Sequence, residues 1–567
     1  MDNRNVRSGY PIPVSNYSDQ PYVVKTDDGG WLMVVTTGVG TEGSKGQHIA
    51  SAKSFDCGKT WSEPVCVESP ENPESSYAVL YKTSYGRVYC FYNYNAENRR
   101  FVLVDPGWLA DEKCYRVDSQ GSFVYKYTDD NGKTWSDKWY EIPQRVMATD
   151  RSNPYGGKVL YFWNVGKPFT LDNSAFVPLY KIGGLKDTFM YKTEGVLLKC
   201  DNINTERDAS KLHWETLPDG DHGIKVPREV SDVSEEHSFV TLSDGSIFCV
   251  FRTVSGNSYC AYSRDKGHTF TAPEKMTYAD GRPMRHPRAA NFIWKCQNGK
   301  YLYWYHNHGG KTYDDRNPVW LSGAVEYAAA DGMRLKFSQP EILLYDPDVM
   351  IRMSYPDMIE EGGAYYFTET QKCLARTHKA ETSLIEGLWS QFDKEGERKH
   401  GIVLQNGSAM PELRPFIERD YTANDSHSVD TGASFSLLLT ADFDKPGVLF
   451  STMTQDHRGM EAAFDGEKIV FTLGDGRRTN VFYSDKAPLA AKGVHTVVVQ
   501  VDAGSRVVSM MIDRKVCDGA DERQFGYGWF DRSLLHANGN QTAFVGEQVC
   551  LAELFPNGLT NSEAFWL

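Results

Sequence analysis

Short segments in which apolar and polar residues alternate run along most of this 567-residue chain, separated by turns rich in Gly and Asp. A period of two residues is typical of β-strands that bury one face. Strand-like segments cover residues 48–53, 122–127, 258–262, 434–443 and 495–503. Residues 380–393 (AETSLIEGLWSQFD) instead show helical periodicity and few β-branched residues, so we expect a helix there. The pattern predicts an all-β protein with a helix between two β-rich parts.

One eight-residue pattern occurs three times, each time directly after a predicted strand. It has the form S/T-x-D-x-G-x-T-W/F and covers residues 54–61, 128–135 and 263–270. The Asp carboxylate can accept backbone N–H groups across a turn, the Gly can adopt a positive φ, and the aromatic residue can pack beneath. We therefore predict that each copy fastens a hairpin and lies away from any active site.

These repeats resemble the Asp boxes (BNR repeats) of the sialidase superfamily. The resemblance implies a six-bladed β-propeller over residues 1–375, because blades of four strands take about 50 residues each. Residues 376–395 would then contain the connecting helix. Residues 396–567 lack the repeat, and their alternating strands resemble a laminin-G or concanavalin-like β-sandwich of jelly-roll type. The expected fold class is all-β, a propeller followed by a sandwich.

The charge of the chain argues against two classes of function. It has 61 Lys and Arg against 75 Asp and Glu, a net charge of -14. Nucleic-acid binding depends on neutralising phosphates and is therefore not expected. No apolar run reaches the roughly 18 residues that a membrane span requires, so no membrane association is expected either.

Cysteine usage indicates a reducing compartment. The 11 cysteines are scattered and form no C-x-x-C pair, so we expect free thiols and neither a disulfide framework nor a zinc site. The first twenty residues show no basic segment followed by an apolar one, as a secretory leader would. We expect a cytoplasmic protein, or a secreted one if a leader has been removed.

Two predicted hairpins carry candidate catalytic residues. Glu236 begins one of them and Arg252 ends it, so both can sit at the same end of adjacent strands. Tyr355 opens the other hairpin and Glu369 closes it. Both hairpins resemble sialidase segments in which the Tyr is the nucleophile, the upstream Glu is its base, and the later Glu holds an arginine in place. The chemistry is plausible because a phenol with a pKa of about 10 needs a carboxylate to take its proton.

Arginines are the expected substrate-binding residues. Residues 315–322 resemble the sialidase strand that presents a second substrate-binding arginine, so Arg316 joins Arg252 in this role. A guanidinium group suits an acidic sugar because it forms two parallel hydrogen bonds with a carboxylate.

The first strand departs from the sialidase pattern. The family has an arginine two residues before a proline there, whereas this chain has Asp19-Gln20-Pro21. An aspartate beside a bound sialate would repel it, so ordinary sialic acid is not the expected substrate. Both Asp19 and Gln20 are expected to lie against the substrate, and Arg285 or Arg288 is the candidate for a replacement charge.

The general acid has two candidates. The family uses an aspartate about a dozen residues before the first Asp box; Glu42 lies near that spacing, and His48 begins the next predicted strand. Either can protonate a leaving oxygen if its pKa lies near the working pH, and Glu42 is favoured. His306, two residues before His308, has no third ligand nearby, so we expect it to bind substrate and not a metal.

The combined interpretation is a retaining exo-glycosidase that removes a terminal, acidic sugar from an oligosaccharide and needs no cofactor or metal. One alternative is a uronic-acid lyase on the same scaffold, in which a histidine (His48, His237, His306 or His308) or a tyrosine is the base. The other is a carbohydrate-binding protein without catalysis. The sequence predicts neither the sugar nor the oligomeric state.

Overall fold

The computed structural model describes residues 2–186, 189–413, 417–419, 428–430, 433–531, 534 and 539–567. Strands dominate the described residues, and the α-helices among them are short: α1 (Ala148–Arg151), α2 (Thr382–Ser390) and α3 (Asn561–Ala564). No helix in these ranges is long and apolar enough to cross a membrane. The prediction of an all-β chain is confirmed, and α2 lies inside the segment where a helix was expected.

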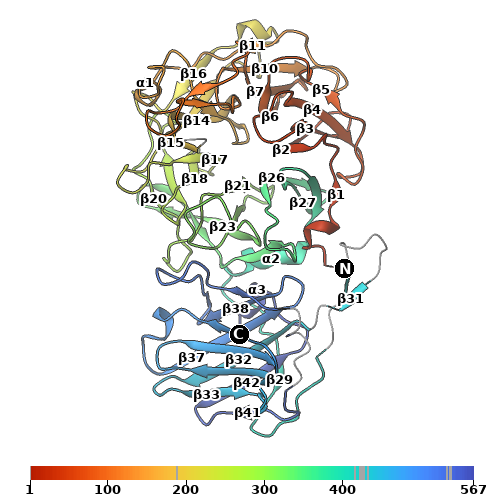
Figure 1. Ribbon diagram of the computed structural model, residues 1–567, viewed down its shortest axis with the longest axis vertical. Coiled ribbons are helices and arrows are strands. Elements are labelled where there is room, and N and C mark those ends of the chain that lie inside the picture. The colour runs from red at the N-terminus through yellow and green to blue at the C-terminus, as the bar shows by residue number, and fades with distance from the viewer. Residues whose placement is uncertain are drawn as a thin grey trace.

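Six antiparallel sheets follow one another in chain order around the upper part of the molecule in Figure 1. The first sheet contains β2 (Tyr17–Lys25), β3 (Trp31–Gly38), β4 (His48–Ser54) and β5 (Val65–Cys66). The second contains β6 (Ser75–Lys82), β7 (Val88–Tyr94), β10 (Ser122–Thr128) and β11 (Tyr140–Glu141), with the pair β8 (Val102–Leu103) and β9 (Lys113–Cys114) inserted before β10. The third contains β12 (Phe162–Trp163), β13 (Phe169–Leu171), β14 (Ser174–Lys186), β15 (Phe189–Cys200) and β16 (Trp214–Leu217).

The other three sheets also consist of four or five antiparallel strands. The fourth contains β17 (Glu235–Thr241), β18 (Ile247–Arg252), β19 (Tyr259–Ser263) and β20 (Glu274–Lys275). The fifth contains β21 (Phe292–Lys295), β22 (Tyr301–Tyr305), β23 (Val319–Ala329), β24 (Gly332–Phe337) and β25 (Glu341–Leu344). The sixth contains β26 (Ser354–Glu361), β27 (Ala364–Thr370), β28 (Ala375–Lys379) and β1 (Tyr10–Pro11).

The first and sixth sheets are connected through the start of the chain and through a contact between their strands. Strand β1 pairs with β28, so the beginning of the chain completes the sixth sheet. Strand β2 contacts β6 of the second sheet and β26 of the sixth, and β17 contacts both β14 and β21. In each of these pairs, strands of neighbouring sheets lie next to one another, so residues on them can share one site.

The three sequence repeats connect the third and fourth strands of the first, second and fourth sheets. In each copy the Asp carboxylate accepts the backbone N–H of the following Thr at 2.9 Å, in the pairs Asp56–Thr60, Asp130–Thr134 and Asp265–Thr269. The glycines have φ values of 76°, 88° and 97°, a region that favours glycine. The predicted fastening of these turns is confirmed.

The last third of the chain forms two further antiparallel sheets. One contains β29 (Ile402–Val403), β32 (Phe435–Asp442), β37 (Val494–Asp502), β38 (Val507–Ile512), β39 (Lys515–Val516), β40 (Gly528–Trp529) and β42 (Val549–Phe555). The other contains β33 (Gly447–Ser451), β34 (Arg458–Phe464), β35 (Ile469–Asp475), β36 (Thr479–Tyr483) and β41 (Phe544–Val545). Strands β30 (Ile417–Arg419) and β31 (Ser428–Asp430) form a separate pair. Side chains from both large sheets, such as Leu437 and Phe471, share one apolar core.

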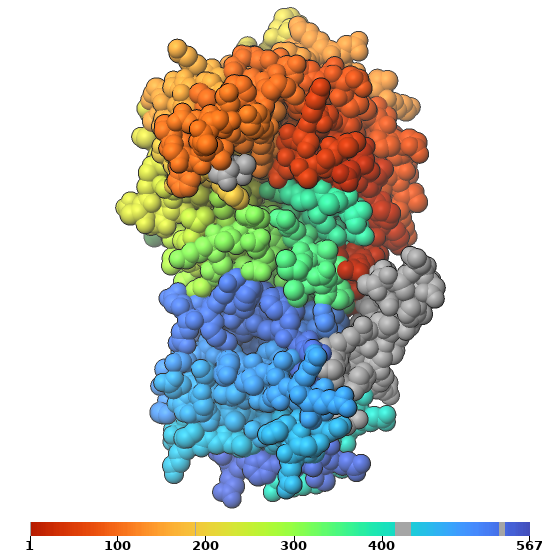
Figure 2. Space-filling view, in the orientation of Figure 1, coloured from red at the N-terminus to blue at the C-terminus, as the bar shows by residue number. Residues whose placement is uncertain are grey.

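The N-terminal and C-terminal parts are in direct contact (Figure 2). Arg4 pairs with Asp502 at 2.8 Å. The buried carboxylate of Glu341 accepts the backbone N–H groups of Asn561 and Ser562, at the start of α3. Burial raises the pKa of Glu341 to about 7, although these hydrogen bonds lower it.

A fully buried ion pair stabilises the third sheet. Lys181 on β14 contacts Asp150 on α1 at 2.6 Å, and neither side chain is exposed. Because Asp150→Ala removes the carboxylate from a buried ammonium group, we expect the free energy of unfolding to fall by about 3–5 kcal/mol. Chemical denaturation measures this loss. The exposed Asp137→Ala is the control and should change the value by less than about 0.5 kcal/mol. A loss of less than about 0.5 kcal/mol in Asp150→Ala would contradict the prediction.

Candidate active site

A cavity of about 280 Å³ brings together side chains from several of the six sheets. Tyr355 and Glu42 line it, together with the aromatic residues Trp163, Phe189 and Tyr313. Its wall is rich in cations, namely Arg116, Arg252, Arg288, Arg316, Arg352 and Lys372. A small concave site with converging charged groups is the kind of place where a polar ligand binds.

A residue in the left-handed conformation interrupts the first strand of four sheets. The φ values are 53° at Gln20, 60° at Tyr77, 53° at Glu236 and 47° at Tyr355. In each case the pairing register shifts beside that residue, as in a β-bulge. Bulges and left-handed non-glycine residues cluster at functional sites, because they redirect a side chain that a regular strand would point elsewhere.

Tyr355 and Glu236 form a direct hydrogen bond. The Tyr355 hydroxyl donates to Glu236 Oε1 at 2.8 Å, and both side chains are buried. Burial and the Glu236 carboxylate raise the pKa of Tyr355, while Lys372 and Arg252 lower it. The phenol is therefore neutral at rest, with its proton already directed at the carboxylate that can accept it.

Arg252 is held by carboxylates of its own hairpin. Its guanidinium contacts Glu235 at 2.8 Å and Glu236 at 2.8 Å, and Arg252 pairs with Glu235 across β17 and β18. The prediction that Glu236 and Arg252 share one end of this hairpin is confirmed. Arg288 pairs with the same Glu235 at 2.7 Å, so Glu235, which the sequence analysis did not single out, serves two arginines.

Glu369 does not have the predicted partner. We expected it to hold an arginine, but its carboxylate contacts His378 Nε2 at 3.2 Å. The antiparallel register of β27 and β28 places Arg376 directly opposite Glu369 and His378 diagonally from it, and the carboxylate contacts the histidine. The arginine-holding role belongs instead to Glu235.

Arg316 is a buried cation with neutral partners. It lies just before β23 and is 4% exposed. Its guanidinium donates to the Tyr313 carbonyl at 2.8 Å and to Ser354 Oγ at 2.7 Å, and no carboxylate contacts it within the described residues. Burial lowers the pKa of Arg316, and the neighbouring Arg252 lowers it further. An anionic ligand would supply the charge that this site lacks.

The surroundings of Arg316 include the C-terminal part of the chain. The loop before it is held by Phe525, whose ring lies 4.8 Å from that of His308, and by Gln524, which donates to Asp315 at 2.9 Å. His308 in turn contacts the Asp315 carbonyl at 2.7 Å. The loop that presents Arg316 is thus fixed from two sides.

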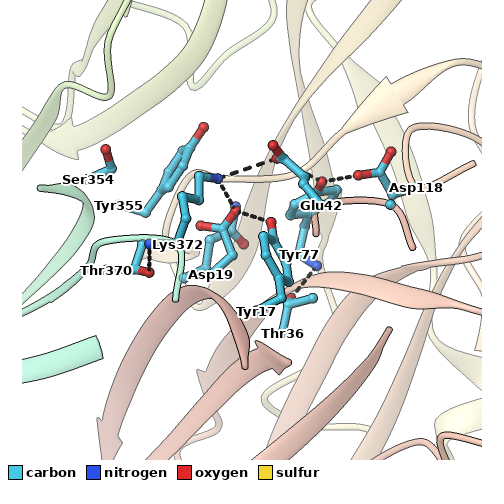
Figure 3. A network of polar contacts seen from close by, with 12 residues as sticks. Tyr17, Asp19, Thr36, Glu42, Tyr77, Asp118, Ser354, Tyr355, Thr370 and Lys372 are labelled. Carbon is cyan, nitrogen blue, oxygen red and sulfur yellow. Dashed lines mark hydrogen bonds and ion pairs between the residues drawn. The ribbon is translucent and has the colours of Figure 1, made fainter. Parts of the chain in front are cut away.

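Asp19 is buried behind the cavity wall and does not line it. It accepts the Tyr17 hydroxyl at 2.7 Å and pairs with Lys372 at 2.5 Å (Figure 3). Asp19 is therefore not expected to repel an acidic sugar directly, because Lys372 lines the cavity here and Asp19 does not. Of the two candidates for a replacement charge, Arg288 lines the cavity, whereas Arg285 pairs with Asp521.

Glu42 lies on the cavity wall beside two cations. Its Oε1 is 3.1 Å from Arg116 and 3.3 Å from Lys372, and it accepts the Tyr77 hydroxyl at 3.2 Å. Burial raises the pKa of Glu42, but Arg116 and Lys372 outweigh it and hold the pKa at about 2. Glu42 is therefore a carboxylate at neutral pH, which favours a base over the acid that we expected.

The other predicted residues lie outside the cavity. His48, Gln20 and His306 do not line it, and each contacts a backbone carbonyl group instead. The same is true of His237 and His308. Burial lowers the pKa of His237 to about 3 and that of His308 to about 4. The substrate-binding roles predicted for Gln20 and His306 are not supported, and the lyase alternative has none of its histidines in the cavity.

Several residues of the site were missed by the sequence analysis. Arg116, Arg352 and Lys372 come from turns and connecting segments, where no periodicity marks a residue as inward-facing. Glu235 could have been predicted, because it directly precedes the candidate base Glu236 at the start of a predicted strand. The described residues contain no group of three or more His, Cys, Asp or Glu side chains that could hold a metal ion.

No protein-family model matches the chain, and no curated protein matches it. Similar solved structures include the intramolecular trans-sialidase from Ruminococcus gnavus, at 13% identity and a TM-score of 0.45, covering 68% of this chain and 99% of that one. Trypanosoma rangeli sialidase is similar at 11% identity and a TM-score of 0.44, covering 99% of this chain and 96% of that one. A protein of unknown function from Dyadobacter fermentans is similar at 16% identity and a TM-score of 0.42, covering 66% and 97%.

Proposed function

We propose that this protein is a sialidase-like, retaining exo-glycosidase that removes a terminal acidic sugar from an oligosaccharide. In this proposal the six consecutive sheets are the blades of a β-propeller, and the last third is a laminin-G or concanavalin-like sandwich. The observation that carries the proposal is the hydrogen bond from Tyr355 to Glu236, 2.8 Å long, beside a cavity walled by cations.

The proposed reaction proceeds in two steps. In the first, the Tyr355 oxygen attacks the anomeric carbon while Glu236 takes the phenolic proton, the glycosidic bond breaks, and the leaving oxygen takes a proton from solvent. In the second, water attacks the same carbon, Glu42 accepts a proton from the water, and the bond to Tyr355 breaks as Glu236 returns the phenolic proton. Glu42 then releases its proton to solvent, which replaces the one that the leaving oxygen took. Two displacements on opposite faces retain the configuration of the sugar. A neutral nucleophile also avoids repulsion by an anionic substrate.

The cations at one end of the cavity favour an acidic sugar. Arg316 is buried without a carboxylate partner among the residues that the structure describes, and the exposed Arg352 lies near it, 5.7 Å from the Tyr313 ring. A carboxylate of the substrate can take both hydrogen bonds of a guanidinium fork. The cavity volume of about 280 Å³ is at the small end of ligand sites, in accord with one terminal sugar.

Product analysis tests this function. The protein is incubated with a panel of sialosides, uronosides and neutral oligosaccharides, and the products are identified by mass spectrometry. We expect a saturated acidic monosaccharide from at least one substrate. An unsaturated product would identify a lyase, and binding without any product would identify a carbohydrate-binding protein; either result overturns the proposal.

A further inference from the structure

Lys372 lines the cavity, but it takes part in no step of the proposed reaction. It lies in the turn between β27 and β28, with a φ of 72°, a region that favours glycine. Its backbone N–H donates to Thr370 Oγ1 at 2.9 Å, and its carbonyl accepts the Ser18 N–H at 2.9 Å. The backbone is thus tied to both β27 and β2, which fixes the starting point of the side chain.

The Lys372 ammonium contacts groups from three different elements. It lies 2.5 Å from Asp19 on β2, 3.3 Å from Glu42 on the β3–β4 connection, and 4.4 Å from the centre of the Tyr355 ring on β26 (Figure 3). The side chain is 19% exposed, so these contacts are largely shielded from water. A cation over an aromatic face is attracted by the ring, and more strongly where water is excluded.

Lys372 is the cation that Asp19 and Glu42 have in common. Arg116 contacts Glu42, whereas the other partner of Asp19 is the neutral Tyr17. Without the ammonium, the buried carboxylate of Asp19 and the partly exposed carboxylate of Glu42 would lose the cation between them, and like charges at short range disfavour ionisation of both.

We propose that Lys372 is a positioning residue of the catalytic site, which binds Asp19 and Glu42 to one ammonium and keeps Glu42 ionised and directed at the cavity beside Tyr355. The inference rests on the proposed function, because it gives Lys372 its task through Glu42. In that reaction an ionised Glu42 is what the attacking water requires as a base.

The charged and titratable groups that face Glu42 support this assignment. They come from β2, β6, the segment before β10 and the turn after β27, and comprise Tyr17, Asp19, Tyr77, Arg116, Asp118 and Lys372. Burial raises the pKa of Glu42, and Arg116, Lys372 and the hydrogen bond from Tyr77 lower it. Removing Lys372 takes away one of the two cations that favour the carboxylate and leaves Arg116 and the Tyr77 hydrogen bond against burial, so we expect the pKa of Glu42 to rise.

Direct titration of Glu42 tests the proposal. The full-length protein is labelled with ¹³C at its glutamate carboxyl groups, and Glu42→Gln identifies the Glu42 signal. In the wild type we expect this signal to stay at its ionised position from about pH 8 down to about pH 4. In Lys372→Met it should move to the protonated position within that range, because a raised pKa brings protonation at higher pH. Lys372→Arg keeps the charge and should behave as the wild type.

Two further variants complete the design. Lys394→Met removes an exposed lysine and is the matched control, which should leave the Glu42 signal unchanged. Lys372→Gln replaces Lys372→Met if the latter does not fold. A Glu42 signal that stays ionised down to about pH 4 without the lysine would overturn the proposal.

The titration uses free protein and no substrate, so its result is separate from that of the activity tests. If the protein cleaves no glycoside but Glu42 shifts as expected, only the proposed function fails. If the protein is active and Glu42 does not shift, only the role of Lys372 fails. In an active protein, the pH–rate profile should contain an apparent pKa that is lost in Glu42→Gln and therefore belongs to Glu42. This pKa should be higher in Lys372→Met and unchanged in Lys394→Met.

Discussion

Tyr355→Phe is expected to lose about 10³-fold or more in kcat on any glycoside that the wild type cleaves. The change removes the single oxygen that, in the proposed reaction, attacks the anomeric carbon, and removal of a nucleophile is among the largest effects known for single substitutions. The ring itself remains, so its packing and its contact with Lys372 are preserved. Steady-state rates with the best substrate from the product panel measure the loss.

The fold of the variant must be intact for this result to be informative. The Tyr355 hydroxyl is buried and bonded to Glu236, so its loss is expected to lower the free energy of unfolding by only about 1 kcal/mol, or to leave it unchanged. Tyr327→Phe is the control, because Tyr327 is 41% exposed on β23 and remote from the chemistry. A Tyr355→Phe protein with more than about a tenth of the wild-type kcat would exclude Tyr355 as the nucleophile.

Arg316→Met is expected to lower kcat/KM for the acidic sugar by at least about 30-fold, mainly through KM. The guanidinium is buried and bonded to neutral groups, so a substrate carboxylate would be its ionic partner. Removing one member of a buried charged pair costs about 2–5 kcal/mol of binding free energy. Arg316→Lys should recover only part of the loss, because an ammonium cannot form the parallel pair of hydrogen bonds.

Stability should respond in the opposite direction to binding. In the free protein Arg316 is a desolvated charge without a carboxylate partner among the described residues, which is unfavourable. Arg316→Met replaces it with an apolar side chain, so we expect an unchanged or higher Tm. The exposed Arg477→Met serves as the control for both measurements and should alter neither. An unchanged kcat/KM in Arg316→Met would show that the acidic group binds elsewhere.

The residues that could be predicted from the sequence lie at the ends of paired strands. Glu236 and Arg252 flank one hairpin, and the antiparallel register brings that end of the hairpin together. Tyr355 opens an equivalent strand two sheets later, and the contacts between first strands bring it to Glu236. A strand with a known partner limits where its side chains can lie, so a local pattern was enough.

The residues that could not be predicted depend on contacts between distant segments. Lys372 lies in a turn that joins β2 from more than 300 residues away, and nothing in its local sequence indicates this. The loop before Arg316 is braced by Phe525 and Gln524 of the C-terminal part, again a contact with no local signal. Glu369 was assigned to an arginine by the resemblance alone, and although the register places Arg376 directly opposite it, its carboxylate contacts the diagonal neighbour His378.

The electrostatics of the site could be predicted even less. Asp19 alone suggested a repulsive site, but the effect of a carboxylate depends on its partners, and Lys372 shields it from the cavity. Glu42 alone suggested an acid, yet Arg116 beside it favours the ionised form. A charge can be located from sequence, whereas its pKa depends on the three-dimensional surroundings.

The covalent state of Tyr355 during turnover tests the central claim most directly. The protein is mixed with its substrate, quenched in acid within the first turnover, digested, and the peptide that contains Tyr355 is weighed by mass spectrometry. We expect a population of this peptide that is heavier by one sugar residue, and its absence from the Glu236→Gln protein if that variant is inactive. An active protein whose Tyr355 peptide stays unmodified, while another residue carries the sugar, would exclude Tyr355 as the nucleophile.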